Sequence, residues 1–393
     1  VFMLVNFKVS NFASFNELQE LSMSAGKVRA HSERLYTDNK NKILKFMAIY
    51  GANASGKSNL VGAFEFAKSI ILDGFPNESS SLFCKLKDEN QDKISRFEFT
   101  ILINGKKYNY GFEVVLATQS FKTEWLYELT YGTNKKVIFE RNVFEETFTV
   151  NTYFKGGTIN ERLNIYAEDI KNASSVLFLS IMNKNKDPLY ESNKEIRLYK
   201  KIFNWFKFRL SVNFSDRPVT NYSYLLNEDS IEEISKLLND FGTGVSKFTL
   251  ADVSIEKITN NVPKELIKEI TDNLAEQQKF FEQKNIERTP AIMLRSAEDA
   301  TMFIIKLNEI GISAQTLQFN HENTNAVFSL SEESDGTVRL LDLIEILLCD
   351  DQEKVYIIDE INRRFHPLLT QKFVEEYLRL STERNIQLIV TTH

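Results

Sequence analysis

The sequence contains few of the residues that mark several specialised protein classes. It has two cysteines, Cys84 and Cys349, which are far apart and match no metal-binding spacing, so we expect reduced thiols. Six prolines and 14 glycines among 393 residues exclude a collagen-like chain, and no tandem repeat or low-complexity tract is present. No apolar run approaches the roughly 18 residues of a membrane-spanning helix, so we expect no membrane partner.

Excess charge of one sign is also scarce. The formal net charge of -6 provides no overall attraction to nucleic acid or to an anionic membrane, so a nucleic-acid contact would require a local basic patch. The first residues lack the basic and then apolar layout of a signal peptide, and we expect a cytoplasmic protein. The apolar share of 42% and charged share of 26% are typical of globular chains, and the length predicts two lobes or one large elaborated domain.

The string GANASGKSN is the most informative feature of the chain. It matches the phosphate-loop pattern G-x-x-x-x-G-K-[ST], in which glycines let backbone N–H groups turn toward phosphate oxygens. The apolar run 43–50 predicts a buried strand before the loop, and residues 57–72 predict the helix after it. Lys57 is expected to neutralise the β- and γ-phosphates of ATP, and the Ser58 hydroxyl to bind Mg²⁺. The predicted nucleotide-binding residues are Gly51, Ala52, Asn53, Ala54, Ser55, Gly56, Lys57, Ser58 and Asn59.

A second apolar strand, predicted at 355–358, ends in two acids, Asp359 and Glu360. Open α/β sheets bind ligands at the carboxyl edge of their strands, and we predict that this strand lies next to the phosphate-loop strand. Asp359 is then the expected Mg²⁺ residue and Glu360 the expected general base for the attacking water. A further predicted strand, 386–390, leads to His393, which we interpret as a sensor of the γ-phosphate.

A serine and a glycine, Ser334 and Gly336, precede a helix predicted at 338–348. Such a helix start is a second anion-binding terminus. Because one γ-phosphate is not easily held by two such termini of the same subunit, we expect Ser334 and Gly336 to cap nucleotide bound by a partner molecule. The alternative is that Ser334 or Asp335 only caps its own helix.

The rest of the chain predicts an antiparallel subdomain followed by a helical region. Alternating strands surround an Asn104-Gly105 turn, extended runs follow at 122–131 and 136–141, and the N-terminus reads as a further hairpin. From about 160 to 291 the pattern is helical, most clearly at 263–288, where a plain amphipathic helix is favoured over a coiled-coil arm. We therefore predict an α/β phosphate-loop ATPase with a lobe at 1–150, a mostly helical insertion at 151–320 and a second lobe at 321–393.

One stretch, 194–209, combines six basic residues with a single acid and five interleaved aromatic residues. This combination suits neutralisation of a nucleic-acid backbone together with stacking on bases. The favoured alternative is a helix whose aromatic residues lie in the core while its lysines lie in water. The aromatic residues are Tyr199, Phe203, Trp205, Phe206 and Phe208.

The order of these motifs resembles that of ABC-type ATPase heads of the SMC and RecF kind. The strings NFASF, GANASGKSNL, YNYGFEV, EWLYEL, LSEESDGT, IIDEINRRFHPLLT and VTTH, which span nearly the whole chain, are similar to those of stand-alone bacterial ATPases of the abortive-infection AbiL and RloA type. Related ATPases serve in the PARIS and OLD-like phage-defence systems. The resemblance implies a homodimer or higher homo-oligomer of heads around ATP, in which Ser334 and Gly336 of one subunit close on the γ-phosphate held by another.

Two departures from the family pattern affect this expectation. Asn362 stands where an aspartate usually follows the catalytic glutamate, which puts the intersubunit contact of that loop in doubt. The sequence also stops at His393, where relatives continue through further strands and helices, so we expect either a fragment or a minimal lobe. Separately, the usual glutamine-bearing lid loop is not identifiable. The resulting hypothesis is an ATP- and Mg²⁺-dependent head that controls a separate effector protein in bacterial antiviral defence. The alternatives are a DNA-repair or chromosome-maintenance ATPase that binds DNA directly, and a scaffold that binds nucleotide without hydrolysing it.

Overall fold

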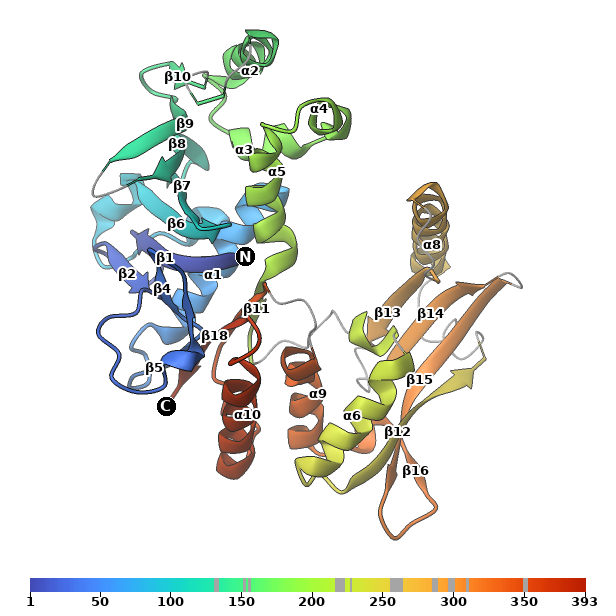
Figure 1. The fold of residues 1–393 in the computed structure, drawn as a ribbon. Coiled ribbons are helices and arrows are strands. Elements are labelled where there is room, and N and C mark those ends of the chain that lie inside the picture. Colours follow the sequence, from blue (N-terminus) through green and yellow to red (C-terminus); the bar gives the residue numbers. More distant parts are fainter. Residues whose placement is uncertain are drawn as a thin grey trace. The chain divides into compact units, whose positions relative to one another are not determined.

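The computed structural model consists of two compact units. Unit 1 comprises Val1–Ser215, Asp351–Ile361 and Leu378–His393, and unit 2 comprises Asp216–Asp350 and Asn362–Tyr377 (Figure 1). The structure describes residues 1–130, 134–150, 153–154, 157–215, 223–226, 228–254, 264–284, 289–295, 301–308, 311–348 and 353–393. Cys84 is a buried free thiol, and Cys349 lies outside the described residues.

Unit 1 contains an antiparallel sheet that, within the described residues, has seven strands in the order β10-β9-β8-β7-β6-β1-β2. The predicted N-terminal hairpin and the hairpin around Asn104-Gly105 are both confirmed, and both turn residues have positive φ, as this tight turn requires. The strands are β1 (Phe2–Ser10), β2 (Gln19–Ser22), β6 (Ser95–Ile103), β7 (Lys106–Val115), β8 (Ser120–Leu129), β9 (Lys135–Asn142) and β10 (Thr147–Thr149).

One face of this sheet packs on helix α1 (Lys57–Asp73). Phe7 of β1 and Phe99 of β6 lie directly opposite each other in the antiparallel pair, so their side chains point to the same face of the sheet. The ring of Phe7 lies 3.9 Å from that of Phe64 on α1 and 4.6 Å from that of Phe99, measured between centroids. This aromatic core places the helix that follows the phosphate loop against the antiparallel sheet.

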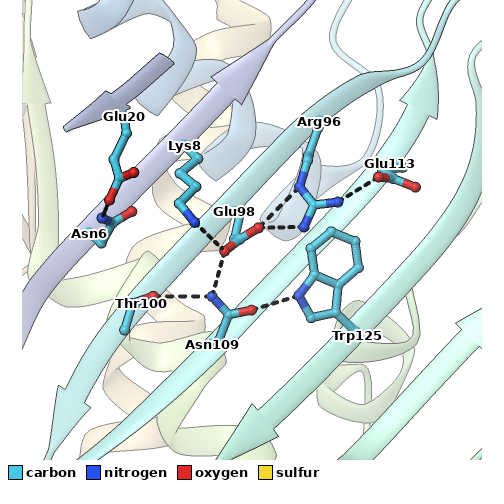
Figure 2. Close-up of polar contacts among 9 residues, drawn as sticks. All are labelled: Asn6, Lys8, Glu20, Arg96, Glu98, Thr100, Asn109, Glu113 and Trp125. Atoms are coloured by element: carbon cyan, nitrogen blue, oxygen red, sulfur yellow. Dashed lines mark hydrogen bonds and ion pairs between the residues drawn. The ribbon is translucent and has the colours of Figure 1, made fainter. Parts of the chain in front are cut away.

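The other face of the same sheet carries a polar network (Figure 2). Glu98 accepts hydrogen bonds from Arg96 and from Asn109, and Asn109 in turn accepts one from the indole of Trp125 at 2.8 Å. Burial alone would raise the pKa of Glu98, but the hydrogen bonds from Arg96 and Asn109 outweigh burial and lower it. Gly111 is required beneath the indole, because a Cβ there would lie 2.3 Å from the Trp125 ring. The network therefore holds strands β6, β7 and β8 in register.

A second sheet in unit 1 is parallel and has the order β11-β17-β18-β5. Its four described strands are β11 (Leu210–Asn213), β17 (Val355–Ile358), β18 (Gln387–Thr392) and β5 (Phe46–Tyr50). Every residue of β17 is buried, as the continuous apolar run predicts. The run 43–50 is not one strand, because β4 (Lys42–Leu44) pairs with β3 (Leu35–Thr37) and precedes β5.

A buried glutamine joins the two sheets of unit 1. Gln387 is fully buried at the start of β18, and its side chain accepts a hydrogen bond from the Leu4 N–H at 2.6 Å. The same amide donates to the carbonyl oxygens of Leu4 and Leu44 at 2.9 and 3.0 Å. Its polar groups are thereby paired inside the core, and strands β1 and β18 are held together.

The helices of unit 1 beyond α1 pack beside the antiparallel sheet. Tyr199, Trp205 and Phe206 of the basic and aromatic stretch are fully buried, so the interpretation of these rings as core residues is confirmed. Phe208 is 60% exposed. The helical elements are α2 (Gly157–Ile170), α3 (Phe178–Asn183), α4 (Asp187–Ser192), α5 (Arg197–Asn204), the π-helical η4 (Trp205–Arg209) and the short turns η1 (Ser32–Arg34), η2 (Ser79–Ser81) and η3 (Asp88–Asp92).

Unit 2 combines helices with an antiparallel sheet of order β12-β15-β14-β13, to which β16 is added beside β15. The sequence analysis missed this sheet, most of which lies within the insertion that was predicted to be mostly helical, 151–320. The predicted helix at 263–288 is α8, and residues 263 and 285–288 lie outside the described part. The elements are η5 (Ser223–Leu226), α6 (Glu228–Asp240), β12 (Val245–Val253), α8 (Lys264–Lys284), β13 (Ala291–Arg295), β14 (Met302–Asn308), β15 (Gly311–His321), β16 (Val327–Phe328), η6 (Leu330–Glu332), α9 (Asp335–Leu348) and α10 (Pro367–Leu380), the last of which continues into unit 1.

Among the described residues, no helix has the length and apolar character that a membrane crossing requires.

Candidate functional site

The phosphate loop connects β5, which ends at Tyr50, to α1, which begins at Lys57. Gly56 has a φ of 93°, a backbone conformation that glycine adopts without steric strain. A Cβ on Gly51 would lie 2.6 Å from the Ser55 hydroxyl, so a larger residue there would require the Ser55 side chain to move. The two glycines of the motif thus allow the tight path that brings the loop onto the first turn of α1.

Lys57 reaches back across this loop. Its ammonium donates hydrogen bonds to the carbonyl oxygens of Gly51 and Ala52 at 2.6 and 3.0 Å. The N-terminus of the 17-residue helix α1 adds unpaired N–H groups and the positive end of the helix dipole. All the residues predicted to bind nucleotide, from Gly51 to Asn59, therefore lie together in one strand–loop–helix unit suited to a polyphosphate.

The N-terminal turn packs directly against the phosphate loop, which the sequence analysis did not predict. A Cβ on Gly56 would lie 2.8 Å from the Ser14 hydroxyl and 3.4 Å from the Phe15 ring. Asn11 anchors this turn by donating to the carbonyl oxygens of Asn90 and Lys93 at 2.9 and 3.1 Å. Residues of the NFASF string therefore lie close to the phosphate loop. This contact was not predicted because the string is far from the loop in the sequence.

The two predicted acids lie where β17 ends. Asp359 is 5% exposed, and its carboxylate accepts a hydrogen bond from the Thr391 hydroxyl at 2.7 Å. The Glu360 N–H donates to the same hydroxyl oxygen at 2.8 Å, and Glu360 has a φ of 47°. The sequence analysis missed Thr391, although its place directly after the predicted strand 386–390 and two residues before His393 indicated the same sheet edge.

The Glu360 carboxylate has neighbours on both sides. One oxygen lies 3.2 Å from Nε2 of His393, and the other accepts a hydrogen bond from the Ser215 hydroxyl at 3.3 Å. His393 follows β18 and Ser215 follows β11, and both strands pair in parallel with β17. The prediction that His393 ends a strand beside the Asp-Glu strand is confirmed, whereas Ser215 was missed because nothing in the sequence placed β11 in this sheet.

The strand order corrects one prediction. The Asp-Glu strand was expected next to the phosphate-loop strand, but β18 lies between β17 and β5. The sequence indicates where each of these strands ends but not which strand lies beside which. A parallel strand that is connected through a helix can add on either side of its neighbour. The functional ends still share one edge because all four strands run in parallel.

The oxygen groups of this edge suit Mg²⁺. Ser58 supplies a hydroxyl and Asp359 a carboxylate, and hard oxygen ligands of this kind are those that Mg²⁺ prefers. Mg²⁺ in nucleotide sites is held by one or two protein oxygens together with phosphates, so it needs no larger protein cluster. Within the part of the chain that the structure describes, no group of three or more His, Cys, Asp or Glu residues able to hold a metal occurs.

Ser334 and Gly336 lie in unit 2, at the start of α9. The Ser334 hydroxyl accepts a hydrogen bond from the Thr337 N–H at 3.1 Å, which is the geometry of a helix N-cap. The alternative prediction, that Ser334 caps its own helix, is thus confirmed as one role, and α9 starts at Asp335, before the predicted 338. The neighbouring Glu333 pairs with His321 of β15 at 2.7 Å, which connects this segment to the sheet of unit 2.

A model of a family of AAA domains matches most of the chain. The model of the family described as "AAA domain, putative AbiEii toxin, Type IV TA system" matches residues 46–393. The chain belongs to this AAA-domain family. The matched region contains the phosphate loop, both acids and His393, so the chain contains a nucleotide-binding phosphate-loop ATPase domain of the AAA type. Its closer assignment to the AbiL and RloA type stays a prediction.

Solved structures with some similarity to this AAA domain are heads of SMC proteins. An SMC head bound to the C-terminal winged-helix domain of ScpA has 14% identity and a TM-score of 0.38, over 99% of this chain and 89% of that one. The SMC head of Thermotoga maritima has 13% identity and a TM-score of 0.34, over 99% and 89%. A head from Pyrococcus furiosus, bound to the C-terminal domain of ScpA, has 16% identity and a TM-score of 0.37, over 100% and 90%. No curated protein matches the chain.

Proposed function

We propose that the chain binds and hydrolyses ATP and that this cycle controls a separate effector. The observation that supports this proposal is the shared edge of the parallel sheet. The phosphate loop, Asp359, Glu360 and His393 all follow strands that end at this edge. A site that only bound nucleotide would need the loop, whereas a second carboxylate beside the first is suited to activating water.

Each residue then has a distinct task. The loop N–H groups and the Lys57 ammonium bind the β- and γ-phosphates, while Ser58 and Asp359 would hold Mg²⁺. Bound Mg²⁺ would neutralise charge that develops on the phosphate oxygens. Glu360 takes a proton from the attacking water, and His393, whose Nε2 lies 3.2 Å from the Glu360 carboxylate, would contact the γ-phosphate.

The direct test of hydrolysis is phosphate release from ATP by the purified chain. We expect turnover that requires Mg²⁺ and stops when EDTA is added, because the γ-phosphate charge is then not neutralised. A heat-treated sample and a Lys57→Ala sample purified in parallel control for contaminating ATPases. Equal phosphate release by the parent and by Lys57→Ala would reject hydrolysis at this site.

The partner and biological role are further parts of the proposal. A second copy would place Ser334 and Gly336 of one subunit against the nucleotide of the other, giving a homodimer or a higher homo-oligomer. The family description names a toxin of a toxin–antitoxin system, which supports a role in bacterial antiviral defence.

Direct DNA binding is the second candidate, since part of the basic stretch is on the surface. Lys201, Lys207 and Phe208 are exposed, whereas Lys200 is paired with Asp187. We expect only weak DNA binding by the isolated chain, because the aromatic rings needed for stacking are mostly buried. Fluorescence anisotropy with labelled duplex at increasing salt is the measurement.

The matched variant is Lys201→Glu with Lys207→Glu, which leaves the buried rings unchanged. Weak binding by the parent that the double variant does not alter would agree with an effector-controlling ATPase. Tight binding at physiological salt that the double variant abolishes would favour the DNA-repair function.

A further inference from the structure

We propose that the Thr391 hydroxyl is a positioning group that sets both acids of the site at once. The expected effect of Thr391 on ATP turnover rests on the proposed ATPase function. Its expected effect on the Glu360 backbone concerns the protein without nucleotide and does not rest on that function. Thr391 lies on β18, between the strand that carries the acids and the strand that leads into the phosphate loop. It is 1% exposed, so its hydroxyl is not available to bulk water.

The hydrogen-bond directions at this hydroxyl follow from its chemistry. A threonine hydroxyl has one proton to donate and lone pairs to accept with. The Glu360 N–H can only donate, so the hydroxyl oxygen is the acceptor of that 2.8 Å bond. The single hydroxyl proton is therefore directed to the Asp359 carboxylate, 2.7 Å away. One side chain thus orients the expected Mg²⁺ carboxylate and fixes the backbone of the expected general base.

The backbone at Glu360 requires such support. Its φ of 47° is one that non-glycine residues rarely adopt, and such conformations persist where surrounding contacts hold them. Three hydrogen bonds hold this turn: the Asp359 N–H donates to the Asn213 carbonyl at 2.9 Å, the Glu360 N–H to the Thr391 hydroxyl, and the Ile361 N–H to the Thr391 carbonyl at 3.0 Å. Of these three, the bond at Glu360 depends on a side chain, so a substitution can remove it while the other two remain.

Thr391→Val is the variant that removes this bond. Valine keeps the branched shape and the strand preference of threonine but leaves the Asp359 carboxylate and the Glu360 N–H without their buried partner. Thr391→Ser keeps the hydroxyl and loses a methyl group, and it serves as the matched control. The melting temperatures of both variants, measured without nucleotide, establish that the fold is retained. If Thr391→Val does not fold, Thr391→Ala takes its place against the same control.

The first measurement is hydrogen exchange in the protein without nucleotide or Mg²⁺. We expect the Glu360 amide to exchange roughly 10- to 100-fold faster in Thr391→Val than in the parent, since one buried hydrogen bond is lost. The Ile361 amide should change less because its own bond to the Thr391 carbonyl remains. This measurement does not depend on catalysis, so it stays decisive even if the chain hydrolyses no ATP.

The second measurement is steady-state ATP turnover. We expect Thr391→Val to reduce kcat by roughly 10- to 100-fold and to raise the Mg²⁺ concentration needed for half-maximal rate, as loss of groups that orient metal ligands does. The KM for ATP should change little, because Lys57 and the phosphate loop are unaffected. Thr391→Ser should retain most of the parent kcat and most of the parent dependence on Mg²⁺ concentration.

Two results would overturn the proposal. Unchanged exchange at Glu360 in a folded Thr391→Val protein would show that the hydroxyl does not hold this backbone. Thr391→Ser behaving like Thr391→Val would show that packing of the methyl group, rather than the hydroxyl, matters. A parent protein without ATPase activity would reject the proposed function separately, and the exchange measurement would still decide whether Thr391 positions Glu360.

Discussion

Glu360→Gln should bind ATP with Mg²⁺ at close to the parent affinity while hydrolysing it at least roughly 100-fold more slowly. Glutamine has nearly the shape of glutamate and keeps an oxygen that can face the Ser215 hydroxyl, but it cannot take a proton from the attacking water. If the heads close around nucleotide, this variant should also accumulate as a dimer, because bound ATP is not turned over. Calorimetric titration, phosphate release and size-exclusion chromatography measure these three properties.

Lys57→Ala is the opposing variant in the same experiment. Removing the ammonium leaves the phosphates without their nearest cation, so binding itself should fail. A Glu360→Gln protein that turns over ATP at the parent rate would remove Glu360 from the role of general base. Normal ATP affinity in Lys57→Ala would show that the phosphate loop is not the ATP-binding site. The two variants therefore distinguish binding from chemistry.

Mixing Ser334→Arg protein with Lys57→Ala protein should restore ATPase activity that neither variant has alone. In a mixed dimer, one site combines an intact phosphate loop with an intact Ser334 from the other subunit, and the second site has neither. With random exchange of subunits in a two-fold symmetric dimer, half of the dimers are mixed and one site in each works, so about a quarter of the parent rate is expected. Phosphate release at several mixing ratios measures the effect.

The helix-cap role of Ser334 makes a folding control necessary. Its hydroxyl accepts the Thr337 N–H, and loss of an N-cap costs about 1 kcal/mol of stability. Ser334→Arg must therefore melt close to the parent temperature, and a labelled-subunit assay must show exchange between dimers. Folded and exchanging variants that give no rescue would contradict capping across the dimer. Full activity of Ser334→Arg alone would also contradict it, and Ser334 would then be a helix cap only.

The structure around the local motifs was predictable because each motif consists of residues that are neighbours in the sequence. Gly51, Gly56 and Lys57 specify a loop that the structure reproduces between β5 and α1. The apolar run before Asp359 predicted a buried strand, since a strand covered on both faces contains no polar alternation. The turn at Asn104-Gly105 was also predictable from the sequence, because few residue pairs readily adopt two positive φ angles.

Contacts between distant segments were not predictable from periodicity or motif. Thr391 and Ser215 reach Glu360 only because β18 and β11 flank β17, and a single sequence does not encode the lateral order of parallel strands in its local pattern. The sheet of unit 2 was missed in part for a related reason, because β12 pairs with β15, and helix α8 lies between these two strands in the chain.

The sequence by itself determined which groups the candidate site contains: a phosphate loop, two acids after a buried strand, and a histidine after another. These groups can be recognised from their residue types and their near neighbours in the sequence. Only the tertiary structure decided which side chains hold the acids in place, that the aromatic residues around Trp205 belong to the core, and that Ser334 caps α9. Such features arise from the packing of elements far apart in the chain, where burial and hydrogen bonding depend on which surfaces meet.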